Sequence, residues 1–188
     1  MIAANEVRVC MNEAGARRQP FLFGVDFELL EGFFVLDPLG QQEILFEVGG
    51  VSNSPMGEGI SGVLSEKMFS MNPMAYEVYQ EKFAVVREGL ARGDSFLLNL
   101  TVATGLDTNW TLEEIFHRAQ SPYRLLVPGR FVCFSPEIFV RMDEGMISSY
   151  PMKGTIDASV PDAERVILED YKERSEHNTI VDLIRNDL

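Results

Sequence analysis

An apolar row on the last predicted helix constrains this chain more than any other feature. Ile180, Ile184 and Leu188 recur every four residues, so they share one face of a helix that runs from about Lys172 to the end. The apolar face is still present at the last residue, Leu188. We therefore expect the chain to be cut short inside a larger fold, because natural domains seldom end in this way.

Carboxylates stand at the start of the same predicted helix. Continuing the apolar row backwards reaches Glu176, and Glu173 and His177 lie on the same face. Two carboxylates at this spacing offer oxygen ligands to a hard cation such as Mg²⁺. The alternative is a structural role, since the first turns of a helix favour negative charge and lie close to solvent. Spacing alone leaves both interpretations open.

Shorter apolar segments predict further strands and helices. Strands are expected at 21–27, 32–36, 44–48, 95–103, 123–127, 130–134, 139–142 and 146–149, a long loop at 49–62, and helices at 111–118 and 161–170. Asn72-Pro73 is expected to begin another helix, with Gly93 as its C-cap. On that helix a buried stripe is expected, formed by Tyr76, Tyr79, Phe83, Val86 and Leu90. Thr111 and Glu114 match a capping box.

The charge and cysteine content restrict the partners and the compartment. Asp and Glu number 29 against 16 Lys and Arg, which gives a formal charge of −13. Such a surface repels nucleic acid and anionic membranes, so we expect neither as a partner. Cys10 and Cys133 lie far apart and outside any metal-ligand spacing, which favours a reducing compartment. With no signal peptide and no apolar stretch of membrane-spanning length, a cytoplasmic protein is expected.

Two separate positions are candidates for catalysis. Lys153 lies in Pro151-Met152-Lys153-Gly154-Thr155, directly after a predicted strand. A desolvated lysine acts as a nucleophile or base, although an ordinary surface lysine in a turn is the alternative. Glu137 follows another strand end, where general acids often lie, or else it is a first-turn helical glutamate. The GxGxxG pattern at 57–62 lacks a βαβ context, so a loop is favoured there over a cofactor site.

Taken together, these segments resemble the chorismate-utilising enzymes. This family includes component I of anthranilate synthase and of aminodeoxychorismate synthase, together with the isochorismate and salicylate synthases. The order and spacing of five segments carry the resemblance, namely 21–27, 93–101, 135–137, 151–155 and 176–188. Lys153 marks the aminodeoxychorismate synthase component I (p-aminobenzoate synthase component I) subclass, because anthranilate synthases carry Ala at this position.

The resemblance also implies roles for the candidate residues. Lys153 would attack the chorismate ring and be displaced by ammonia, while Glu137 would serve as general acid for the departing hydroxyl. Gly154 and Thr155 would line the substrate site. Glu176 would bind Mg²⁺, with Glu173 on the same metal-facing turn, and the Mg²⁺ would hold a carboxylate of chorismate.

The fold implied by the resemblance is α+β. It is the layered fold of anthranilate synthase component I, truncated, with helices outside two large, mainly antiparallel sheets. Residues 1–188 would form the N-terminal portion of a single chorismate-binding catalytic domain whose C-terminal half is absent. Because that half would carry a second Mg²⁺ glutamate, the chain alone is expected to be inactive.

The implied function is amination of chorismate to 4-amino-4-deoxychorismate for p-aminobenzoate and folate biosynthesis. A glutamine amidotransferase subunit is the expected partner and source of ammonia. Two departures from the family pattern are Tyr150, where Arg is common, and His177, where this subclass often has Asn. His177 favours an alternative, anthranilate synthase component I. A third hypothesis is a non-catalytic fragment that docks the amidotransferase.

Overall fold

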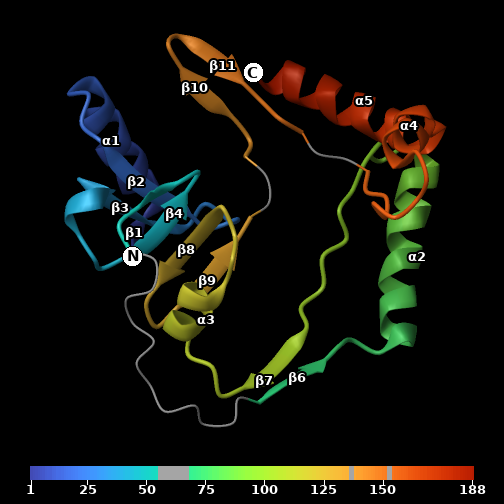
Figure 1. The fold of residues 1–188 in the computed structure, drawn as a ribbon, viewed down its shortest axis with the longest axis horizontal. Coiled ribbons are helices and arrows are strands. Elements are labelled where there is room, and N and C mark those ends of the chain that lie inside the picture. The colour runs from blue at the N-terminus through green and yellow to red at the C-terminus, as the bar shows by residue number, and fades with distance from the viewer. Residues whose placement is uncertain (55–67, 136–137, 152–153) are drawn as a thin grey trace. The chain divides into compact units, whose positions relative to one another are not determined.

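The chain forms two compact units that both combine helices with paired strands. The computed structural model describes residues 1–54, 68–135, 138–151 and 154–188. One unit consists of Met1–Met56 and Ala119–Leu188, and the other of Gly57–Arg118. All strand pairs in the described ranges are antiparallel (Figure 1). The structure therefore confirms the predicted α+β class with antiparallel sheets.

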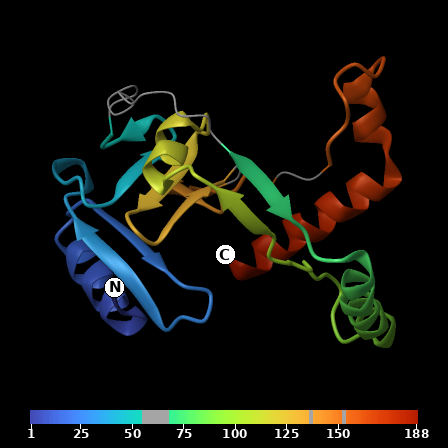
Figure 2. The ribbon, with the colours of Figure 1, turned by 90° about the horizontal axis from the view of Figure 1, so that it is seen from below.

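The first unit begins with a helix packed on a small sheet. Helix α1 (Ala4–Ala16) contacts the sheet of order β1-β3-β2, formed by β1 (Ile2–Ala3), β2 (Phe21–Val25) and β3 (Glu31–Leu36) (Figure 2). Val7 of the helix is fully buried. The helix approaches closely at Gly32, where an added Cβ would lie 3.1 Å from Cγ2 of Val7. Both longer strands of this sheet are predicted by the sequence pattern, whereas the helix that covers it is not.

A second sheet of the same unit has the order β5-β4-β8-β9. Its strands are β4 (Leu45–Val48), β5 (Val51–Ser52), β8 (Tyr123–Val127) and β9 (Phe131–Phe134), and a short 3-10 helix, η1 (Pro38–Gly40), precedes it. One buried apolar cluster is formed by Phe33 of β3, Val127 of β8, and Ile44, which directly precedes β4. This cluster joins the two sheets, because its members come from both of them.

The rest of the first unit carries the helix on which the acidic pair Glu173 and Glu176 was predicted. A hairpin of β10 (Arg141–Asp143) and β11 (Met146–Ser148) is followed by helices α4 (Ala163–Glu169) and α5 (Tyr171–Asp187). These bounds agree closely with the predicted hairpin and helices. Of the predicted row on α5, Ile180 and Ile184 are half-buried and Leu188 is exposed. Among the described residues, none of the helices has the length and apolar character needed to cross a bilayer.

The second unit pairs two short strands and carries two helices. Strand β6 (Phe69–Asn72) pairs with β7 (Gly105–Thr108), and the helices are α2 (Tyr76–Arg92) and α3 (Leu112–Arg118). Helix α2 ends at Gly93, which takes the left-handed conformation with φ +83°, as predicted. The capping box is also confirmed, because Thr111 and Glu114 each accept a hydrogen bond from the backbone N–H of the other.

Three expectations for this unit are wrong. Asn72 does not cap α2, because it belongs to β6 and the helix begins at Tyr76. Residues 95–103 form no strand, and the strand of this region is β7 instead. The apolar stripe of α2 is not buried in the described structure, where Tyr76, Phe83 and Leu90 are exposed. The periodicity identified the apolar face correctly but could not show what covers it.

Candidate functional site

The N-terminus of α5 positions the predicted pair of acidic residues. Asp170 is the N-cap, and its Oδ1 accepts a hydrogen bond of 2.9 Å from the backbone N–H of Glu173. Asp is favoured at this position because its carboxylate satisfies an N–H that has no partner within the helix. The cap fixes Glu173 in the first turn, and Glu176 follows almost one turn later on the same side.

A lysine that sequence reasoning passed over joins the two glutamates. Nζ of Lys172 lies 3.0 Å from Oε1 of Glu173 and 3.2 Å from Oε1 of Glu176. The hydrogen bonds to Glu173 and Glu176, in that order of importance, raise the pKa of Lys172 above its ordinary value of 10.5. Lys172 stands four residues before Glu176, and this spacing was the signal that could have revealed the ion pair.

The segment that follows Lys153 contacts the first glutamate. Gly154 has φ +82°, and a Cβ added there would lie 2.7 Å from Oε2 of Glu173. The structure therefore brings together two of the predicted site residues, Gly154 and Glu173. Thr155 is exposed. Glycine suits this position twice over, because it accepts the positive φ and leaves room for the carboxylate.

The two predicted catalytic side chains, Lys153 and Glu137, lie outside the described residues. For each of them, the residue that follows directly in the chain is described. Gly154 follows Lys153 directly, and β9 ends shortly before Glu137. Beyond that segment, Ser149 donates a hydrogen bond of 2.6 Å to the backbone carbonyl of Phe139, which ties the β10–β11 hairpin at its base. The roles of Lys153 and Glu137 stay predictions.

The carboxylate pair suits part of a Mg²⁺ site. Its two Oε1 atoms already converge on one cation, the Lys172 ammonium, and hard divalent cations prefer such oxygen ligands. Within the described residues, no group of three or more His, Cys, Asp and Glu side chains could hold a metal ion. Mg²⁺ commonly takes one or two carboxylates and completes its shell with water and substrate oxygens. Glu173 and Glu176 are therefore the residues that would hold the ion.

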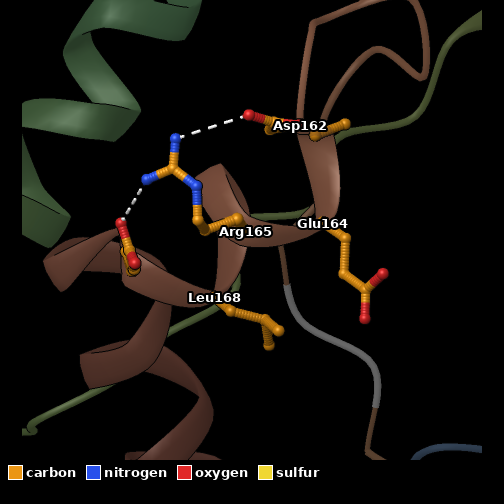
Figure 3. Close-up of a pocket in the computed structure, with 6 residues that line it drawn as sticks. Asp162, Glu164, Arg165 and Leu168 are labelled. Atoms are coloured by element: carbon orange, nitrogen blue, oxygen red, sulfur yellow. Dashed lines mark hydrogen bonds and ion pairs between the residues drawn. The ribbon is translucent and has the colours of Figure 1, made fainter.

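An open pocket beside α4 does not suit an anionic substrate. Its lining includes Asp162, Glu164, Arg165 and Glu169 (Figure 3). The guanidinium of Arg165 pairs with Asp162 at 3.6 Å and with Glu169 at 3.0 Å. The lining therefore carries three carboxylates and one cation, and this balance repels a further anion. The α5 carboxylates with the Gly154 segment remain the better candidate site.

Comparison with known proteins assigns the chain to a family. Residues 63–188 match the family described as chorismate binding enzyme. An uncharacterized PabA-like protein of Pasteurella multocida is 43% identical over 182 residues, which cover 94% of this chain and 54% of that protein. A similar uncharacterized protein of Haemophilus influenzae is 44% identical over 178 residues, or 94% of this chain and 53% of that protein. The chain thus spans about half the length of these curated relatives.

A more distant relative has an assigned activity. Aminodeoxychorismate synthase component 1 of Escherichia coli is 33% identical over 128 residues, covering 61% of this chain and 28% of that protein. No solved structure matches the chain.

Proposed function

The chain belongs to the chorismate-binding enzyme family, and we propose that it takes part in the amination of chorismate to 4-amino-4-deoxychorismate. That reaction leads to p-aminobenzoate and folate. One observation carries the proposal: Gly154, the residue next to Lys153, lies against Glu173 of the carboxylate pair. The motif that contains Lys153 in the sequence therefore has one described residue, Gly154, beside the proposed cation-binding helix. The similarity to an aminodeoxychorismate synthase component supports the same activity.

Each residue of the proposed site has one task. The Lys153 amine forms a bond to the ring carbon as the C–O bond to the ring hydroxyl breaks, and Glu137 protonates the departing oxygen to give water. Ammonia then displaces the lysine, so the nitrogen of ammonia is left on the carbon that carried the hydroxyl. Glu173 and Glu176 would hold Mg²⁺, which would supply positive charge for a chorismate carboxylate. Gly154 and Thr155 form the backbone that lines the substrate.

The source of ammonia and the compartment follow from the same proposal. Glutamine is the expected nitrogen donor, so we expect a glutamine amidotransferase subunit as partner. Its binding is tested by co-purification of the two proteins and by glutamine-dependent product formation. The proposal includes a cytoplasmic location, which is supported by the wide separation of Cys10 and Cys133 in the sequence, a pattern typical of reducing compartments.

Anthranilate synthesis is the second candidate function. His177 is the residue that favours it, together with an anthranilate synthase component 1 of Haloarcula marismortui that is 32% identical over 124 residues, covering 60% of this chain and 25% of that protein. The two functions differ in the ring position that receives the amino group, which is ortho to the ring carboxylate in anthranilate and para to it in 4-amino-4-deoxychorismate. Anthranilate also requires loss of the enolpyruvyl group as pyruvate. Lys153 favours amination alone.

A product assay tests the proposal. The full-length protein, as made in the cell, is incubated with chorismate, Mg²⁺ and ammonium. The products are then separated by chromatography. We expect 4-amino-4-deoxychorismate from the wild type and none from Lys153→Ala. Lys82→Ala, which removes an exposed lysine of α2, is the matched control and should keep its activity. Anthranilate as the product, or full activity of Lys153→Ala, would refute the proposal.

A further inference from the structure

The ammonium of Lys172 occupies the point on which the carboxylates of Glu173 and Glu176 converge. Its Nζ lies 3.0 Å from one Oε1 atom and 3.2 Å from the other. A divalent cation bound by both oxygens would need the same space, since Mg²⁺–O bonds of about 2.0–2.1 Å place the ion between its ligands. The ammonium and the metal ion also repel each other, so both cannot be held there together.

We infer that Lys172 is an internal competitor for the divalent cation. It neutralises Glu173 and Glu176 when no metal is bound, and its ammonium must move away before the metal enters. The inference rests on the proposed function, because that proposal places Mg²⁺ on this pair. It adds a residue that sets the concentration of Mg²⁺ at which the site fills.

The side chains of Glu173 and Lys172 differ in solvent exposure, and this difference supports exchange. Glu173 is only 24% exposed, its backbone is tied to the Asp170 cap, and Gly154 lies against its carboxylate. The Lys172 side chain is 72% exposed. A half-buried carboxylate beside an exposed ammonium suits a site whose ligand stays in place while its counter-ion leaves. Because exposed ion pairs are weak, moving the ammonium into water costs little.

Removal of Lys172 should therefore strengthen metal binding. Exposed ion pairs of this kind correspond to roughly a two- to fivefold change in an equilibrium constant. We expect Lys172→Met to bind Mn²⁺ about two- to fivefold more tightly than the wild type. Lys172→Arg keeps a cation within reach of both carboxylates and should bind Mn²⁺ as the wild type does.

The experiment is a Mn²⁺ titration of the 188-residue protein, with free Mn²⁺ measured by electron paramagnetic resonance. Arg174→Met is the matched control, because it removes the same charge from the same turn but about 200° around the helix from Lys172. Its affinity should change much less than that of Lys172→Met. Circular dichroism verifies that each variant retains its helices. In the wild type, added Mg²⁺ should also shift the side-chain NMR signals of Lys172 and leave those of Lys82 in place.

The possible outcomes separate the inference from the proposal beneath it. Equal Mn²⁺ affinity for Lys172→Met and wild type, or equal tightening by Arg174→Met, overturns the competitor role of Lys172. If Glu173→Gln and Glu176→Gln still weaken binding in that case, the metal proposal survives. If neither wild type nor Lys172→Met shows binding that depends on these carboxylates, the competitor role and the metal site both fail.

Discussion

Gly154 and Glu173 are in contact across a loop and a helix, and no side chain larger than hydrogen fits between them. A Cβ on Gly154 would lie 2.7 Å from Oε2 and 3.4 Å from Cβ of Glu173. The distance to Oε2 is too short for a tolerated contact, so the Glu173 carboxylate would have to move, whereas the distance to Cβ is that of an ordinary contact. The contact links Gly154, which follows Lys153 in the sequence, to the carboxylates proposed to hold Mg²⁺.

Substitution of Gly154 should therefore impair metal binding. Gly154→Ala is expected to displace Glu173 and weaken Mn²⁺ binding by about tenfold, as for other residues that orient a metal ligand. Gly145→Ala is the control, because Gly145 has a similar φ of +79° and no neighbouring atom within 4 Å. Both variants carry the same cost of positive φ, about 1 kcal/mol. Equal Mn²⁺ affinities for the two variants would contradict the contact.

A buried ion pair in the four-stranded sheet should contribute strongly to stability. Glu47 of β4 and Arg124 of β8 are cross-strand partners whose Oε2 and Nη2 atoms lie 2.5 Å apart, with side chains 19% and 5% exposed. Glu47→Gln leaves the Arg124 charge buried without its counter-ion. We expect a loss of about 3 kcal/mol in the free energy of unfolding, measured by urea denaturation followed by circular dichroism.

An exposed ion pair nearby provides the comparison for Glu47. Glu31 and Arg130 lie 3.3 Å apart with nearly half of each side chain exposed. Glu31→Gln should cost less than about 1 kcal/mol, since water replaces the lost partner. Similar losses for Glu31→Gln and Glu47→Gln would show that burial does not strengthen the Glu47–Arg124 pair.

Asp157 should titrate below its ordinary range. Its Oδ1 accepts a hydrogen bond of 2.8 Å from the backbone N–H of Ser159, and this bond, followed by one from the Ser159 side chain, lowers the pKa of Asp157 below 3.8. A pKa lowered by folding means that the ionised form stabilises the turn. That stability is present above the unfolded pKa and is lost as the pH falls through the lower, folded value. Carboxyl ¹³C NMR measures the titration, and a midpoint at or above 3.8 would contradict the hydrogen bond.

Features set by neighbouring residues were predicted well from the sequence. The capping box of Thr111 and Glu114 and the C-cap at Gly93 depend only on residues within one or two turns, and both are present. Asn72 carries an equally good local signal for a helix start. It fails because the strand pairing of Asn72 with Gly105, distant in the chain, takes that residue into β6. A local pattern cannot reveal such a partner.

The candidate site shows the same difference between features set by local spacing and contacts between distant residues. Helical spacing predicted that Glu173 and Glu176 share a face, and the common contact with Lys172 confirms it. The approach of Gly154 to Glu173 depends on how a loop returns to a helix, and no spacing rule predicts it. Only the resemblance to a family placed both residues in one site. Local sequence made Lys153 and Glu137 candidates, but the specific roles assigned to them depend on that resemblance.

The proposed amination depends most directly on a covalent bond between Lys153 and chorismate. The protein, at its natural length, is incubated with chorismate and Mg²⁺ without ammonia or glutamine, and its intact mass is measured. We expect a mass increase equal to chorismate less one water, which is absent in Lys153→Ala and is reversed by ammonium with release of 4-amino-4-deoxychorismate. Product formation with no adduct at Lys153, or the same adduct in Lys153→Ala, would contradict it.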